Sequence, residues 1–231
     1  MIKTALVAAL LFPTALPAAD AVLSGTVVIR GRIEKAANPH LHASAYDSYD
    51  GPSSYGDDAS EGEPAQQLVV YLEGLPPAKA SDPAPVLSQK NRNFTASIVP
   101  VQPGEMVTIR NDDRVRHHVR SNAKPWDFNL KPRPPGESVT RSFEAPKDGG
   151  VGVIPVYCDI HSNMRAHILV MPSRKWQLLP ETGGHFKLTG IPPGTYTLTA
   201  WHPTLKPVPV KVTIRKGQRK SVELVLLGKE D

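Results

Sequence analysis

The sequence predicts an all-β protein. Its 24 prolines and 17 glycines separate short apolar runs, and no stretch has the spacing of apolar residues expected for a long helix. Residues 195–201 and 208–214 alternate apolar and polar side chains, as strands do when one face lies on a core and the other in water. Strands at spacings of about 8–12 residues, with turn residues between them, are typical of a β-sandwich.

In chain order, the first expected strand covers residues 22–33 and the second covers 67–75. The second strand is apolar on both faces, so we expect both faces to be buried. Between them, residues 36–66 are dominated by Asn, Pro, His, Ser, Tyr, Asp and Gly, which favours a flexible acidic loop. His40 and His42 lie in this loop and could bind metal adventitiously.

The remaining strands are expected to be short. Residues 122–136 are rich in proline and are expected to be irregular, and Pro209 indicates that its strand lies at a sheet edge. The expected strands cover residues 86–89, 94–99, 106–110, 139–143, 151–157, 165–171, 195–201, 208–214 and 221–227.

The N-terminus has the features of a secretory signal peptide, expected at residues 1–19. A basic start at Lys3 is followed by an apolar run over residues 5–12 and an alanine-rich exit, with cleavage possible after Ala19 or Ala21. No other segment is long and apolar enough to span a membrane. The mature protein is therefore expected to be exported, either to a periplasm or to the medium, without a membrane span.

Charged residues are unevenly distributed. Residues 36–78 hold seven acidic and no basic residues, whereas residues 79–231 hold 23 basic and 13 acidic residues. A basic body would suit a redox partner with an acidic surface through electrostatic steering, although ordinary solubility explains it equally well. The basic residues lack the interleaved aromatic side chains of a nucleic-acid-binding surface, so no nucleic-acid partner is expected.

Cys158 is the only cysteine, so it cannot form an internal disulfide. An unpaired thiol in an oxidising compartment is reactive unless something occupies it. His161 follows three positions later and Met164 three positions after that. A thiolate, an imidazole and a thioether are donors that copper prefers, while zinc prefers more thiolates or a carboxylate. The segment 111–119 offers a second imidazole, and the sequence therefore predicts a copper site.

Residues 84–172 resemble the cupredoxin, or blue-copper, family, which includes plastocyanin-like and methylamine-utilisation-type proteins. The resemblance rests on three motifs: the turn and strand Pro103-Gly104-Glu105-Met106-Val107, the loop Asn111-Asp112-Asp113 leading to His117, and Cys158-x-x-His161-x-x-Met164. It implies a Greek-key sandwich that binds one copper ion. His117, Cys158 and His161 would be the main ligands and Met164 the axial ligand.

Two positions depart from the family pattern. The gap between His161 and Met164 is short, so Met171, His167 or a backbone carbonyl could take the axial position, or no axial ligand could bind. The residue after the first ligand is His118, which could replace His117 or hydrogen-bond the cysteine loop. Asn111 and His118 are thus expected to support the site. Adjacent strand residues point to opposite faces, so His117 and His118 are not expected to bind the same ion.

A second resemblance covers the two ends of the chain. The segment Phe186–Leu198 is similar to the hairpin of the carboxypeptidase regulatory-like family of small transthyretin-like sandwiches, and the family's first two strands have counterparts at Gly25–Val27 and Val69–Leu72. This implies a discontinuous sandwich of residues 20–80 and 173–231, with residues 84–172 inserted between its second and third strands. The alternative is a sequential arrangement in which the first two strands join the cupredoxin-like part.

The function expected from these features is single-electron transfer through one copper ion, with a redox partner such as a cytochrome or a periplasmic oxidoreductase. Copper delivery or storage, and a structural or surface module with a vestigial metal site, are the alternatives. We do not expect an enzyme, because a trigonal copper site leaves no position open for a substrate. The sequence offers no Ser/His/Asp arrangement or phosphate-binding loop, and Asp112 and Asp113 are interpreted as loop caps.

Overall fold

The computed structural model describes residues 20–34, 66–76 and 83–230. Every regular element in these residues is a strand, and they contain no helix that could cross a membrane. The prediction of an all-β protein is therefore confirmed. The expected signal peptide and most of the expected acidic loop, with His40 and His42, lie outside the described residues.

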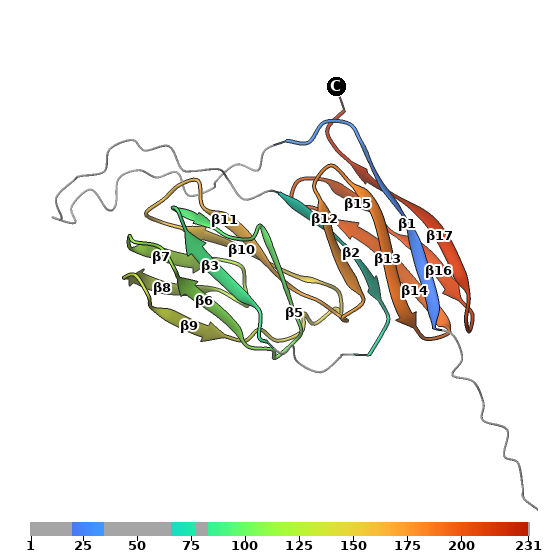
Figure 1. Cartoon of the computed structure of the whole chain (residues 1–231), viewed down its shortest axis with the longest axis horizontal. Coiled ribbons are helices and arrows are strands. Elements are labelled where there is room, and N and C mark those ends of the chain that lie inside the picture. Colours follow the sequence, from blue (N-terminus) through green and yellow to red (C-terminus); the bar gives the residue numbers. More distant parts are fainter. Residues whose placement is uncertain (1–19, 35–65, 77–82, 231) are drawn as a thin grey trace, which may run out of the picture.

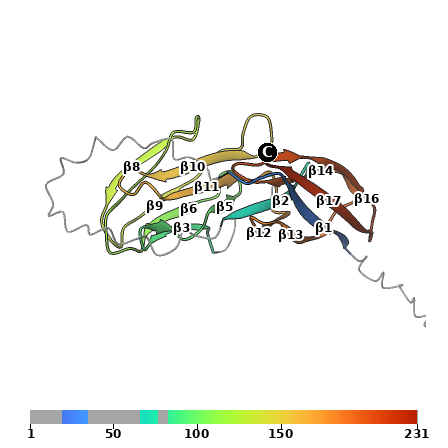
Figure 2. The same ribbon diagram turned by 90° about the horizontal axis from the view of Figure 1, so that it is seen from above.

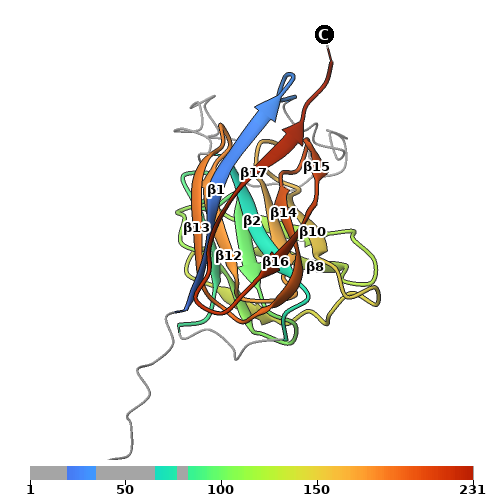
Figure 3. The same cartoon turned by 90° about the vertical axis from the view of Figure 1, so that its right-hand side faces the viewer.

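One sandwich is built from both ends of the chain (Figure 1). Its strands are β1 (Ala21–Arg30), β2 (Gln67–Glu73), β12 (Trp176–Pro180), β13 (Gly184–Ile191), β14 (Gly194–Trp201), β15 (Lys206–Val208), β16 (Val210–Ile214) and β17 (Arg219–Leu227). They form two sheets of order β13-β1-β17-β15 and β12-β2-β14-β16. β1 lies between antiparallel β13 and parallel β17, which Figure 3 shows running beside it. β2 lies between β12 and β14, antiparallel to both.

The other sandwich is built from the middle of the chain. Its strands are β3 (Val86–Lys90), β4 (Asn93–Phe94), β5 (Ile98–Val101), β6 (Val107–Asn111), β7 (His117–Ser121), β8 (Phe128–Arg133), β9 (Ser138–Arg141), β10 (Gly152–Cys158) and β11 (Arg165–Val170). They form sheets of order β4-β3-β6-β9 and β5-β11-β10-β7-β8. Among the described strands, β1 and β2 pair with strands that follow residue 173 and with none of β3–β11. The boundaries of two separate domains stay a prediction.

Each sandwich has its own apolar core. Leu23, Leu72 and Leu198 lie in the core of the first sandwich, and none of these side chains is exposed. In the second sandwich, Ile154, Val156 and Cys158 of β10 face a core that also receives side chains from β3, β6 and β11. The inward side chains follow the period of two along each strand, as expected for sheets packed face to face.

A third apolar cluster joins the two sandwiches, which lie side by side in Figure 2. It combines Val69 and Tyr71 of β2 with Ile98 of β5 and Leu169 of β11. The intervening residues of β2 face the first core, so both faces of this strand are buried, and the prediction for it is confirmed. Parts of one sheet from each sandwich are therefore covered on both sides.

Three expectations about local structure are wrong. His117 and His118 are the first residues of β7 rather than part of a loop, because this strand is held between β10 and β8. The segment expected to be irregular contains β8, which pairs with β7. The expected strand 208–214 is divided at Pro209: Val208 pairs with β17 in one sheet, and Val210–Ile214 pairs with β14 in the other.

Candidate metal centre

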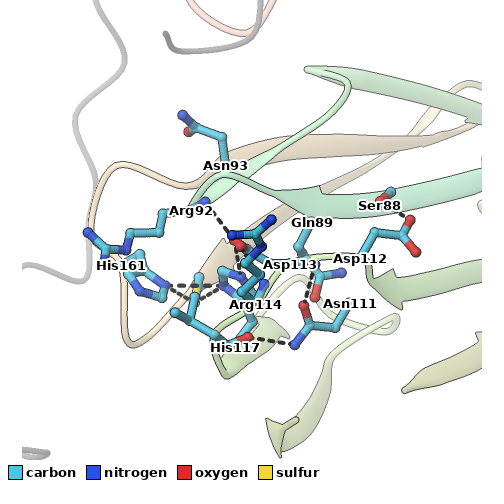
Figure 4. Close-up of polar contacts among 12 residues, drawn as sticks. Ser88, Gln89, Arg92, Asn93, Asn111, Asp112, Asp113, Arg114, His117 and His161 are labelled. Atoms are coloured by element: carbon cyan, nitrogen blue, oxygen red, sulfur yellow. Dashed lines mark hydrogen bonds and ion pairs between the residues drawn. The ribbon is translucent and has the colours of Figure 1, made fainter. Parts of the chain in front are cut away.

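Three nitrogen and sulfur atoms from two separate segments meet at one end of the middle sandwich. His117 begins β7, Cys158 ends the neighbouring strand β10, and His161 lies in the turn that follows. The Cys158 Sγ atom is 3.8 Å from His117 Nδ1 and 3.7 Å from His161 Nδ1. The two Nδ1 atoms are 3.1 Å apart, and Figure 4 shows the two rings pointing toward each other.

The backbone fixes this arrangement. The Asp159 N–H donates to the carbonyl of His118 at 3.0 Å, which continues the pairing of β10 with β7 beyond Cys158. The Met164 N–H donates to the carbonyl of His161 at 3.1 Å, which closes a tight turn before β11. Two of the three donors thus come from one short loop, and the third comes from the adjacent strand.

The positions of the three atoms fit a metal ion. The circle through His117 Nδ1, His161 Nδ1 and Cys158 Sγ has a radius of about 2.1 Å, whereas metal–nitrogen and metal–sulfur bonds are about 2.0–2.3 Å. A buried thiol with two imidazole nitrogens is also a soft donor set of the kind that copper prefers. Of the described His, Cys, Asp and Glu residues, these three form the group able to hold a metal ion.

Asp113 orients the first imidazole. Its Oδ2 atom is 3.0 Å from His117 Nε2, so the Nε2–H tautomer donates to the carboxylate and leaves the Nδ1 lone pair for a metal. The carboxylate also accepts from the backbone N–H groups of Arg92, at 2.6 Å, and Arg114, at 2.7 Å. Burial opposes ionisation of Asp113, but these hydrogen bonds outweigh it and lower the pKa of the carboxyl group.

Burial keeps all three candidate ligands uncharged in the absence of a metal. It lowers the pKa of His117 against the opposing effect of Asp113, and it lowers the pKa of His161 to about 4, with the charges of His117 and Arg92 adding to the effect. Burial raises the pKa of the Cys158 thiol, although the His118 N–H lies 3.4 Å from Sγ and favours the thiolate. A metal that binds here displaces the thiol proton.

Asn111 and His118 hold the surrounding backbone. The Asn111 side chain donates to the carbonyls of Val115, at 2.9 Å, and Arg133, at 3.0 Å, and accepts from the Asp113 N–H. The His118 ring points away from the three donor atoms and places Nε2 2.6 Å from Asn129 Oδ1. His118 therefore contacts the cysteine through its backbone, while its neighbour His117 supplies the imidazole.

Met164 is fully buried in the same core cluster as Cys158. The alternatives for an axial ligand lie elsewhere: Met171 belongs to the cluster between the sandwiches, and the His167 ring packs against Trp201 at a centroid distance of 5.4 Å. Of the three side chains considered, Met164 is the one that shares the core with the cysteine.

The role of Asp113 was missed in the sequence, because its position after Asn111 and Asp112 suggested a loop cap. The signal that could have found it is its spacing. Asp113 precedes His117 by four residues, and the intervening turn brings the carboxylate to the far nitrogen of the ring.

Comparison with solved structures finds copper proteins that resemble part of this chain. A mutant of amicyanin in its reduced form is 19% identical, with a TM-score of 0.34, over 44% of this chain and 97% of amicyanin. A purple cupredoxin from Nitrosopumilus maritimus is 28% identical, with a TM-score of 0.29, over 33% of this chain and 80% of that protein. The name of the second protein is that of the family that the motifs around Cys158 resemble.

A copper-containing nitrite reductase from Thermus scotoductus SA-01 is 20% identical, with a TM-score of 0.34, over 38% of this chain. This chain spans only 22% of the length of the nitrite reductase. No protein-family model matches the sequence, and no curated protein shows significant similarity to it. The resemblance of the other sandwich to transthyretin-like proteins stays a prediction.

Proposed function

We propose that this protein binds one copper ion through His117, Cys158 and His161, and that it transfers single electrons to and from a redox partner. The proposal rests above all on the triangle of Nδ1, Nδ1 and Sγ atoms, whose size matches the bond lengths of a metal ion. Copper bound by such donors would cycle between its two oxidation states. Met164 is the proposed axial ligand.

The protein's own residues have defined tasks in this function. Asp113 holds the His117 ring in one tautomer, and the His118 N–H stabilises the thiolate of Cys158. His161 is the least buried of the three ligands, so its imidazole edge is the proposed route for electrons. The surrounding strands keep the ligands in place in both oxidation states, because they are fixed by sheet pairing and core packing.

Titration of the purified protein with Cu(II) tests the proposal. We expect one equivalent to bind, to produce an intense thiolate-to-copper absorption band, and to give a reversible one-electron couple at an electrode. Cys158→Ser should lose the band while remaining folded, because serine is close in size to cysteine and the sheets do not depend on the thiol. Tight copper binding without a reversible couple would favour copper delivery or storage instead.

We further propose that the protein is exported, with cleavage of residues 1–19 or 1–21. The observation that supports export is the pattern of the N-terminal segment. N-terminal sequencing of the protein recovered from outside the cytoplasm should begin at Asp20 or Val22. A mature protein that still begins at Met1 would contradict this part of the proposal.

A further inference from the structure

Three loops meet around His161 at the end of the middle sandwich. They are the turn between β3 and β4 (residues 90–93), the loop before β7 (112–116) and the cysteine loop (159–164). The Arg92 N–H donates to Asp113 in the second loop at 2.6 Å, and Asn163 of the third loop donates to the Arg92 carbonyl at 3.4 Å. The three loops are thus joined into one surface.

The charged side chains on this surface are mostly cations. Lys90, Arg114 and Arg116 are exposed, and Arg92 is half-buried. Arg92 and His161 lie beside each other in Figure 4. A positive charge therefore stands directly beside the proposed electron route.

The carboxylates on the same loops are already engaged. Asp112 lies 2.7 Å from Arg110 Nε and accepts from the Ser88 hydroxyl. Asp113 accepts from backbone N–H groups and His117, and Asp159 lies 2.5 Å from Arg120 Nε. Among the described residues, Arg114 and Arg116 form no ion pair with any of them. Arg114 and Arg116 therefore make the described part of this surface positive.

The cysteine loop also exposes an apolar side chain. Ile160, next to His161, is 36% exposed and is one of few large apolar side chains with this much exposure among the described residues. Exposed apolar side chains bordered by polar ones are usual at protein–protein interfaces. Nucleic-acid surfaces add exposed aromatic side chains for stacking, which these loops lack.

We propose that Lys90, Arg114 and Arg116 form, on the loops beside Ile160 and His161, a docking face for a redox protein with an acidic surface. This inference rests on the proposed electron-transfer function. The cations attract the partner and bring its redox centre to the His161 edge, and such steering raises association rates by about 10–1,000-fold at low salt. The attraction is screened once the Debye length falls from about 30 Å at 0.01 M salt to a few ångströms at 1 M.

A pair of cytochromes that differ mainly in charge tests the docking face. Cytochrome c is used as isolated, with a basic surface, and after succinylation of its lysines, which makes it acidic while keeping the haem. The copper-loaded, reduced protein is mixed with each oxidised cytochrome, so that one electron passes from Cu(I) to Fe(III) and leaves Cu(II) and Fe(II). The second-order rate constant is measured by stopped flow between about 0.01 and 0.5 M salt, a range over which screening changes strongly.

We expect the rate with the acidic cytochrome to be high and to fall steeply with salt. R114Q/R116Q should lower it at least about tenfold at low salt and flatten its salt dependence. The matched control R215Q/R219Q removes the same charge from exposed positions on the other sandwich and should change the rate less than about twofold. Both variants should keep the copper band and nearly the same reduction potential. A lower rate then reports weaker docking and not a change at the metal site.

Two results would overturn the docking face. One is an equal loss of rate in R114Q/R116Q and R215Q/R219Q. The other is an unchanged rate in R114Q/R116Q. Loss of binding to vesicles of phosphatidylserine in the same variant would then assign the cations to a membrane surface. Failure of the proposed function itself looks different, because the wild-type protein would then lack the copper band and the reversible couple.

Discussion

At His117, one side of the imidazole faces Cys158 and the other side contacts the carboxylate of Asp113. A carboxylate on the far nitrogen of a ligand histidine raises the basicity of the ring. The effect is larger for the metal state of higher charge, so Asp113 should stabilise Cu(II) more than Cu(I). Because backbone N–H groups of Arg92 and Arg114 hold the carboxylate, this contact is built into the loop.

Asp113→Asn tests this effect. We expect the affinity for Cu(II) to fall about 10–100-fold and the affinity for Cu(I) to fall less. The reduction potential should therefore rise, by about 59 mV for each tenfold change in the ratio of the two affinities. Voltammetry and competition with a copper chelator measure both quantities. Asp148→Asn, at an exposed loop position, is the control, and an equal potential in the two variants would contradict the role of Asp113.

Met164 offers a second test on a single residue of the site. Replacement by leucine conserves volume, so Met164→Leu should cost less than about 1.5 kcal/mol of unfolding free energy. If the thioether is an axial ligand, the same variant should alter the copper absorption bands and raise the reduction potential. Met171→Leu is the matched control, since Met171 is equally buried but lies between the sandwiches. Identical spectra in the wild type and both variants would exclude Met164 as a ligand.

In strand β1, Gly25 leaves no room for a side chain. A methyl group added there would lie 1.7 Å from the carbonyl oxygen of Val222 in β17 and 2.9 Å from the ring of Phe186 in β13. Because both neighbours are core strands of the same sheet, neither can move away cheaply. The glycine is required by the close approach of these strands.

Gly25→Ala should therefore lower the unfolding free energy by about 3 kcal/mol or more. Urea denaturation of the variant, compared with Ser24→Ala in the same strand, measures the difference. The serine variant should change stability by only a few tenths of a kcal/mol, as most substitutions away from packed sites do. A similar stability of the two variants would show that β1 and β17 are not packed as closely as described.

The elements also show what sequence patterns can and cannot predict. Apolar residues at successive positions identified β2 as a strand buried on both faces, and the spacing from Cys158 to His161 predicted two donors on one loop. Strand β8 was missed because Pro125, Pro132 and Pro134 suggested irregular structure, although its pairing with β7 stabilises it as a strand. Pro209 predicted a strand at a sheet edge, and β15 and β16 are both edge strands, but the proline also divides the expected strand between two sheets. Such outcomes depend on partners distant in sequence, which local patterns do not contain.

For the whole molecule, the placement of β1 and β2 decides what can fold separately. Each lies between two strands from the C-terminal part of the chain, and both contribute to its core. Residues 173–231 alone would lack an inner strand in each sheet. The two sheets of the middle sandwich, in contrast, contain only strands β3–β11.

We therefore expect a fragment of residues 173–231 to be unfolded, and a fragment of residues 84–172 to fold and bind copper. Circular dichroism with thermal denaturation measures folding, and copper titration measures the site. Exposure of the apolar surface around Leu169 should make the second fragment less soluble than the full chain. Cooperative unfolding of the first fragment would contradict the insertion of residues 84–172 into the other sandwich.

The pairing of β1 with β17 imposes an order on biosynthesis. A ribosome makes β1 before the strands of the middle sandwich and β17 after them, and β17 then takes the position between β1 and β15. The middle sandwich has all its strands before that point and can form while the chain is still growing. A truncated chain that lacks β17 would leave one edge of β1 open to strands of other chains. Premature termination should therefore produce aggregates, even though the copper ligands are already in place.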